Sequence, residues 1–266
     1  MQVDLSHAAG FSLTLDTETC ELIDGPSLRF GRIPRRLGDL KPVLFDADGS
    51  DPNTEVYWTF PLLVGGQAAA ALEVRGLTFS CVVLPSLTIG REFVKTQGHY
   101  HPPMPGSDIP YPEVYTHLWG EPSLLLQRRL ENQSDRIDDC ALLALRDGDT
   151  VTIPPGYAHI LINQSPQPAM IAGLYSRAFA PKYDPIIRTA GAAYYVIDDA
   201  ATPVIPNARY AARPPLKQMN GPGGTPFAPP DPDRPLWTSF IADPAKYAFL
   251  TDPQAARRHF ASRSGS

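Results

Sequence analysis

Short apolar segments bounded by turn residues recur along most of this chain, and they limit the folds that it can adopt. At least nine such segments lie between Phe11 and Asp198, spaced by roughly 10–20 residues, whereas helical patterns are few. They cover residues 11–15, 55–60, 77–84, 114–119, 123–127, 150–153, 158–163, 170–175 and 193–197. One helix is expected over 65–74, where alanine and leucine give high helix propensity. The pattern favours an all-β sandwich or barrel.

Prolines make up 30 of the 266 residues, about 11% against a usual ~5%, and they are unevenly distributed. Eight of them lie between Arg213 and Pro235, together with three glycines. Such a stretch lacks the backbone donors for a helix or a central strand. We therefore expect one domain over 1–210 and a Pro/Gly-rich, mostly irregular C-terminal extension over 211–266, either a tail on the body or a linker. Helical character is expected only at 253–260.

Composition also excludes several classes of partner. A net charge of −5 leaves no basic face for nucleic acid. No window holds 18 uninterrupted apolar residues, so no membrane partner is expected. The first residues lack the pattern of a secretory signal, and the three scattered cysteines have no C-x-x-C spacing. We expect a cytoplasmic protein with buried, reduced thiols.

Two histidine-containing segments carry the chemistry. His99 and His101 are two residues apart, so on a strand both side chains project to the same side. Glu113 follows on the next apolar segment, and His159 lies in a second segment that begins at Gly148. Three imidazoles and one carboxylate suit one divalent ion of iron, manganese, nickel, cobalt or zinc. Asp108 is a rival carboxylate ligand.

Together the two segments resemble both halves of the cupin pattern. In the first half, His-x-His is followed by a glutamate, six residues and then a glycine, as in Glu113 to Gly120. The second half matches at Gly148, Pro154, Gly156, His159 and Asn163. The resemblance implies a cupin fold, a jelly-roll or double-stranded β-helix barrel.

A narrower resemblance joins these motifs to the archaeal-type, cupin-fold glucose-6-phosphate isomerases, over roughly Phe11 to Tyr210. It is carried by Arg-Arg-Leu-Gly-Asp-Leu at 35–40, Gly-Arg-Glu-Phe-Val-Lys-Thr-Gln-Gly-His-Tyr-His at 90–101 and Glu-Val-Tyr at 113–115. It implies sugar-phosphate isomerisation and the metal ligands His99, His101, Glu113 and His159.

Aldose–ketose interconversion moves a hydrogen between C1 and C2 while the carbonyl is polarised. We expect a metal-stabilised enediolate, with Glu113 as the base that relays the proton. A metal-assisted hydride shift is the alternative, and the sequence does not distinguish the two. Strand alternation turns Tyr115 and His117 to the same side as Glu113, so both are predicted to be catalytic. The resemblance adds Tyr175 as a catalytic and substrate-binding residue.

Substrate contacts also follow from the resemblance. Thr96 and Gly98 match phosphate contacts of the family. Val82 stands where the family carries a phosphate-contacting threonine, and Pro181 replaces a family histidine. Arg177 and Lys182 are expected to supply the lost phosphate contacts.

Two further expectations concern the substrate and the assembly. The eleven-residue loop 102–112 is expected to reshape the substrate pocket. A homodimer is expected, because unpaired strand edges in a small barrel need a partner. A cupin oxygenase or lyase acting on another small polar metabolite is the alternative enzyme, and a non-catalytic sugar-binding cupin is a third possibility.

Overall fold

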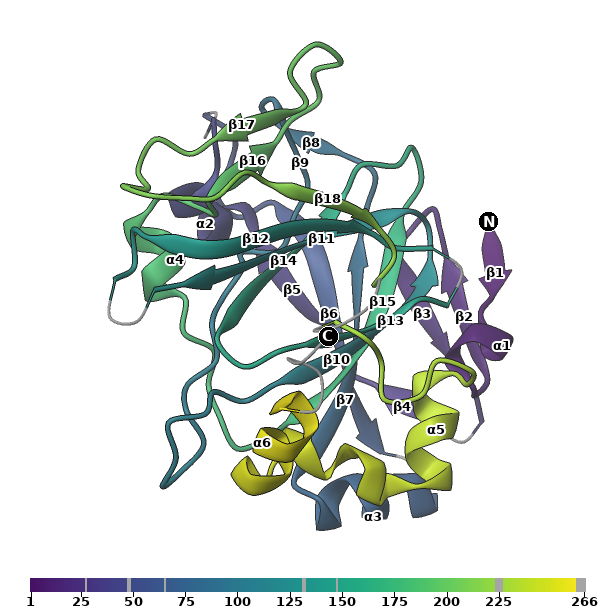
Figure 1. Ribbon diagram of the computed structural model, residues 1–266. Coiled ribbons are helices and arrows are strands. Elements are labelled where there is room, and N and C mark those ends of the chain that lie inside the picture. Colours follow the sequence, from purple (N-terminus) through teal and green to yellow (C-terminus); the bar gives the residue numbers. More distant parts are fainter. Residues whose placement is uncertain are drawn as a thin grey trace.

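Two largely antiparallel sheets face each other in the computed structural model (Figure 1), which describes residues 1–26, 28–46, 49–64, 66–130, 133–146, 148–222 and 227–261. The larger sheet has the order β13-β10-β15-β7-β6-β4, with β5 also paired to β6. Its strands are β4 (Arg29–Phe30), β5 (Ile33–Arg36), β6 (Glu55–Val64), β7 (Leu77–Leu84), β10 (Glu113–Trp119), β13 (Thr150–Ile153) and β15 (Ala169–Ser176).

The second sheet has the order β14-β11-β12-β18. It consists of β11 (Pro122–Arg129), β12 (Ile137–Ala144), β14 (Tyr157–Asn163) and β18 (Lys217–Asn220), and only the β12–β18 pair is parallel. All nine predicted apolar segments overlap strands of the structure. The expected all-β architecture is therefore confirmed.

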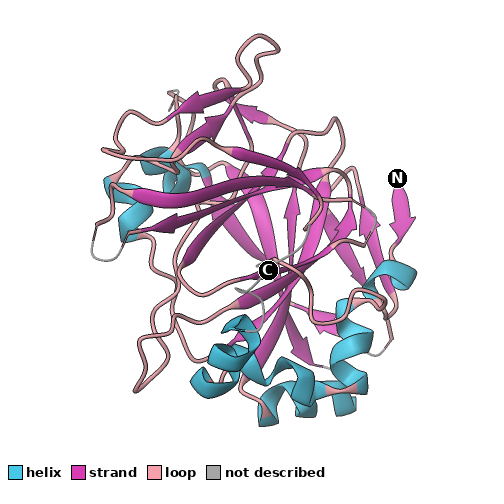
Figure 2. Cartoon of the chain, viewed as in Figure 1, coloured by secondary structure: helices cyan, strands magenta, loops and turns pink. Residues whose placement is uncertain are grey.

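Smaller elements surround these sheets, and the helices gather at their periphery (Figure 2). The remaining strands are β1 (Gln2–Asp4), β2 (Leu13–Asp16), β3 (Glu21–Asp24), β8 (Thr88–Ile89), β9 (Glu92–Phe93), β16 (Tyr194–Val196) and β17 (Val204–Pro206). The helices are α1 (Ser6–Ala9), α2 (Leu37–Leu40), η1 (Lys41–Val43), α3 (Gly66–Val74), α4 (Asp184–Arg188), α5 (Leu236–Ala242), η2 (Pro244–Leu250) and α6 (Pro253–Ala261). The helix predicted over 65–74 is confirmed as α3, although residue 65 lies outside the described residues. No described helix is long and apolar enough to cross a membrane.

Strand alternation separates the core from the interior cavity. On β7, Leu77, Phe79, Cys81 and Val83 pack into the largest apolar cluster, whereas Ser80 and Val82 line a cavity. This is the period of two expected for a strand with a different environment on each face. Cys20, Cys81 and Cys140 are buried and free, as the sequence predicted.

The C-terminal extension packs on the body. Its proline-rich part contributes the edge strand β18, and α5, η2 and α6 bury residues such as Trp237 and Phe240 in the largest apolar cluster. The ring of Trp237 lies 5.0 Å from that of Phe79 between centroids. More helix forms than the sequence indicated, because prolines stand at the N-terminal ends of these helices, where a missing N–H costs nothing. The domain boundary at residue 210 stays a prediction.

Candidate metal centre

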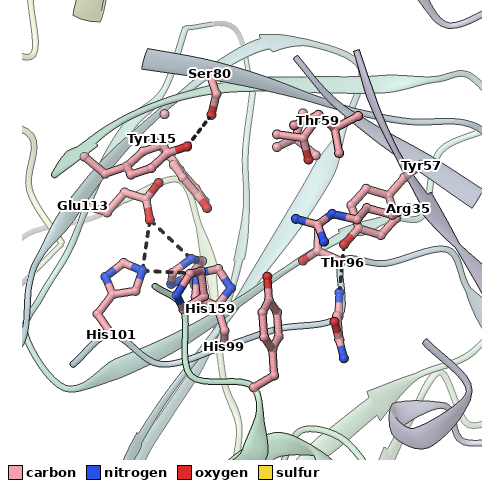
Figure 3. Close-up of a pocket in the computed structure, with 18 of the residues that line it drawn as sticks. Arg35, Tyr57, Thr59, Ser80, Thr96, His99, His101, Glu113, Tyr115 and His159 are labelled. Carbon is pink, nitrogen blue, oxygen red and sulfur yellow. Dashed lines mark hydrogen bonds and ion pairs between the residues drawn. The ribbon is translucent and has the colours of Figure 1, made fainter. Parts of the chain in front are cut away.

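Four side chains from distant parts of the sequence converge inside the fold. His99, His101, Glu113 and His159 each offer one ligand atom, and these atoms all lie within 4.8 Å of one another. The Nε2 atoms of His99 and His101 are 3.1 Å apart. Glu113 Oε2 lies 3.5 Å from His101 Nε2 and 3.4 Å from His159 Nε2. Figure 3 shows the three imidazoles and this carboxylate pointing toward one another.

Backbone pairing creates this convergence. The segment 95–99 runs along the outer edge of β14, where the Thr96 N–H donates to the Leu161 carbonyl at 2.8 Å. His99 therefore stands directly opposite His159 in an antiparallel bridge. Glu113 begins β10 in the facing sheet, so the cluster joins both sheets.

A backbone carbonyl orients one of the rings. His101 Nδ1 donates to the Tyr111 carbonyl oxygen at 2.8 Å, which leaves the lone pair on Nε2 toward the cluster. Its ring also packs against Phe179, with 4.3 Å between centroids. Tyr111 belongs to the loop 102–112, so this loop acts on the site by holding a ligand ring.

Burial keeps the cluster neutral. It lowers the pKa of the His99 and His159 rings well below the ordinary imidazole value, and neighbouring imidazoles lower it further. Burial also lowers the pKa of His101 to about 4, against the opposing effect of its bond to the Tyr111 carbonyl. Burial raises the pKa of the Glu113 carboxyl group well above its ordinary value, opposed by a hydrogen bond from Tyr115. Neutral imidazoles with inward lone pairs are the form that binds a cation.

The residues present fit a divalent metal ion. Both ring nitrogens of His159 are buried and have no hydrogen-bond partner among the described residues. Buried polar atoms in folded proteins are almost always satisfied, so an orphaned imidazole beside three other ligand groups needs a partner. A mixed set of imidazole nitrogens and one carboxylate oxygen suits first-row divalent metals. The cluster could hold such an ion.

The cluster opens on a cavity of about 320 Å³. Tyr115, Tyr175 and Gly98 also line it. Arg35, Tyr57, Thr59 and Thr96 lie on the side of the cavity opposite Glu113 and the imidazoles (Figure 3). The cavity therefore has a cluster end and a second, polar end.

Comparison with known proteins assigns the family. The sequence profile of glucose-6-phosphate isomerase matches residues 35–213. The chain belongs to this family. The glucose-6-phosphate isomerase of Thermococcus litoralis is 30% identical over 172 residues, which cover 64% of this chain and 80% of that protein. The glucose-6-phosphate isomerase of Thermococcus gammatolerans is 27% identical over 209 residues, which cover 78% of this chain and 100% of that protein.

Similarity to solved structures is more distant. A cupin 2 conserved barrel domain protein from Rhodopseudomonas palustris is 12% identical, with a TM-score of 0.33 over 57% of this chain and 76% of that chain.

The structure does not bring His117 to the cavity of this family member. Its Nε2 lies 2.6 Å from the Gly120 carbonyl oxygen, and it lines a separate pocket between the N-terminal residues and the extension. Strand alternation correctly predicted that His117 lies on the same face of β10 as Glu113, but alternation does not give the distance along the strand. Glu113 pairs with Tyr175 on β15 and His117 with Ile171, four residues farther along, about 13 Å at the rise of a strand.

Three further predicted residues lie outside the cavity. Arg177 lines a surface pocket beside α3. Lys182 is exposed, because it lies between Pro181 and Tyr183, which face the cavity in this extended segment. Asp108 is also exposed and forms an ion pair with Arg257, which removes it as a rival ligand. None of residues 102–112 lines the cavity, in contrast to the expectation for that loop.

Sequence reasoning missed several cavity residues. Tyr57 and Thr59 alternate on the predicted strand 55–60, so a period-two signal was present. Arg35 lies on β5, a four-residue strand that contains a proline and gives no apolar alternation. Tyr183 follows the last strand of the motif region and carries no local signal.

Proposed function

We propose that this chain is a metal-dependent aldose–ketose isomerase that interconverts glucose 6-phosphate and fructose 6-phosphate. The observation that carries the proposal is the buried cluster of three imidazoles and one carboxylate at one end of a cavity of about 320 Å³. Membership of the glucose-6-phosphate isomerase family supports the same reaction.

His99, His101, Glu113 and His159 would hold one divalent ion of iron, manganese, nickel, cobalt or zinc. When bound, such an ion supplies a Lewis acid that polarises the sugar carbonyl and the adjacent hydroxyl group. The buried setting excludes bulk water and strengthens every electrostatic interaction with the substrate.

Glu113 is the proposed base. Its Oε2 faces the imidazoles, whereas Oε1 lies toward Gly173 on the neighbouring strand. Oε1 would take the proton from C2 of the aldose and return it to C1, while a second proton passes from the C2 hydroxyl to the carbonyl oxygen. Tyr115 lies on the same face of β10 as Glu113 and lowers the pKa of its carboxyl group, so its hydroxyl would steady the carboxylate during the transfer.

Tyr175 is the proposed second polar group at this end of the cavity. Its hydroxyl lies 3.2 Å from Ser80 Oγ. Burial raises its pKa, with an opposing effect from Ser80, so the phenol stays protonated and can donate to a substrate oxygen.

Thr96 and Gly98 would contact the phosphate group. The Thr96 hydroxyl oxygen accepts the Leu161 N–H at 3.0 Å, which leaves the hydroxyl proton to donate to a ligand. Gly98 has a φ of +77°, and a Cβ atom there would lie 2.5 Å from Ile160 Cγ1, so only glycine fits at this point of the wall.

A coupled assay tests the function. The protein is stripped of metal, reconstituted anaerobically with each of the five ions, and assayed for glucose 6-phosphate formed from fructose 6-phosphate. We expect turnover that EDTA abolishes and that His99→Ala lowers by more than about a hundredfold. His7→Ala, a change at an exposed histidine, is the matched control. No turnover with any ion would reject the proposal and point to another small polar metabolite, as for an oxygenase or lyase.

A homodimer is a separate proposal. Leu63 on β6 is 64% exposed beside the short strands β4 and β5 at the edge of the larger sheet, where a second copy would cover it. Light scattering after size exclusion should give twice the chain mass, and a mass of one chain would reject the dimer.

A further inference from the structure

Arg35 is the only lysine or arginine side chain among the described residues that line the cavity. It lies on β5 opposite Tyr57 of β6. Ile33 faces the cavity as well, whereas Arg36 is exposed and donates to the Asn53 carbonyl at 3.3 Å. Strand alternation therefore directs one of two adjacent arginines into the interior and the other to solvent.

The guanidinium group of Arg35 has no counter-ion in the part of the chain that the structure describes. No carboxylate of the described residues lies within 4.0 Å of it, and its Nε is buried without a hydrogen-bond partner among them. Arg32, three residues earlier, pairs with both Glu21 and Glu55. Ion pairs thus neutralise the outward-facing Arg32, whereas the inward-facing Arg35 has no such partner among the described residues.

An unpaired charge and an orphaned buried donor both destabilise the protein without ligand. A bound anion removes this cost, and the planar guanidinium group matches a phosphate through two parallel hydrogen bonds. Arg35 thereby supplies hydrogen-bond donors to the cavity, whereas the side chain of Val82 offers none at the cavity surface.

The position of Arg35 fixes which part of a ligand it meets. It lies with Tyr57 and Thr96 on the side of the cavity away from Glu113 and the imidazoles (Figure 3). A molecule whose carbonyl end reaches the cluster therefore presents its far end to Arg35. For a sugar phosphate, the far end is the dianionic phosphate monoester.

We propose that Arg35 binds the phosphate group of the substrate and selects phosphorylated sugars over free ones. The inference rests on the proposed function for the identity of the substrate. Arg35 takes the part that the sequence assigned to Arg177 and Lys182, both of which lie outside the cavity.

Calorimetry with inorganic phosphate tests the site without any turnover. The full chain, stripped of metal, is titrated as wild type, Arg35→Met, Arg35→Lys and the control Arg36→Met. We expect the dissociation constant to rise roughly 10- to 100-fold in Arg35→Met, with partial recovery in Arg35→Lys and no change in Arg36→Met. Equal phosphate affinity in wild type and Arg35→Met, or no binding by wild type, would overturn the proposal.

Kinetics with the metal-loaded protein give the second test. In Arg35→Met, KM for fructose 6-phosphate should rise roughly 10- to 100-fold while kcat changes less than about threefold, as expected for binding remote from the reacting carbons. A fall in kcat with unchanged KM would overturn the phosphate role. If the wild type turns over no hexose phosphate, the proposed function fails, and phosphate calorimetry alone then decides whether Arg35 forms an anion site.

Discussion

Thr59 stands directly opposite Val82 in the register between β6 and β7, and both side chains line the cavity. The family resemblance puts a phosphate-contacting threonine at the position of Val82. In this chain a threonine hydroxyl reaches the same cavity from the neighbouring strand, about 5 Å away. In this chain the threonine hydroxyl group of this part of the cavity wall therefore lies on β6 and not on β7.

The presence of this hydroxyl group on β6 in place of β7 predicts the behaviour of two variants. Thr59→Val should lower kcat/KM for fructose 6-phosphate about tenfold, because a hydroxyl that hydrogen-bonds a charged group is lost. Thr59→Val combined with Val82→Thr should recover activity to within about threefold of the wild type. Steady-state kinetics of the single and double variants measure both effects. An unchanged kcat/KM in Thr59→Val would show that this hydroxyl does not contact the substrate.

Gly173 makes room for two side chains of the candidate site. A Cβ atom there would lie 2.8 Å from Tyr115 Cε1 and 3.0 Å from Glu113 Oε1. Gly173→Ala should displace both groups and lower kcat by on the order of a hundredfold, with reduced metal content by elemental analysis. Gly31→Ala is the control, because its Cβ atom would meet only Leu63 at 3.4 Å. Full activity in Gly173→Ala would show that the added Cβ atom does not displace Tyr115 or Glu113.

The C-terminal extension should contribute strongly to stability. Phe240 on α5 is fully buried, whereas its neighbour Ile241 is 41% exposed. Phe240→Ala should lower the free energy of unfolding by about 3–5 kcal/mol, because it leaves a cavity in the core. Ile241→Ala should change it by less than about 1 kcal/mol. Urea denaturation followed by circular dichroism distinguishes the two, and equal small losses would mean that α5 is only loosely packed.

The edge strand β18 should detach in acid. Asp139 accepts from Lys217 at 2.7 Å and from Tyr157 at 2.6 Å. Burial raises the pKa of Asp139, but these hydrogen bonds outweigh it and hold the pKa below its ordinary value of 3.8. The stabilisation is present above pH 3.8 and is lost as the pH falls through the lower, folded pKa.

Hydrogen exchange of residues 217–220 measures this effect. Their protection should decrease below pH 3.8 in the wild type and should already be reduced at neutral pH in Asp139→Asn. Arg188→Met, which removes an exposed ion pair to Asp184 on α4, is the control. Protection that is independent of pH in the wild type would contradict the role of Asp139.

The sequence predicted the strands and the cluster because both depend on local spacing. His99 and His101 share a face through alternation, and the two halves of the motif bring in Glu113 and His159, which lie on facing sheets and meet at the cluster. His117 shows the limit of alternation, which gives the face of a strand but not the distance along it. Arg35 could not be found in this way, because its position depends on pairing between β5 and β6 across a gap of about twenty residues.

The parallel pairing of β18 with β12 has a consequence for synthesis on the ribosome. Ala144 and Lys217 are 217 − 144 = 73 residues apart, so at ~5–20 residues per second the edge of β12 emerges roughly 4–15 s before its partner exists. During that interval the open edge can pair with another nascent chain. Because β18 is synthesised last and then covers the open edge of β12, the speed of translation between the two strands affects the yield of folded protein.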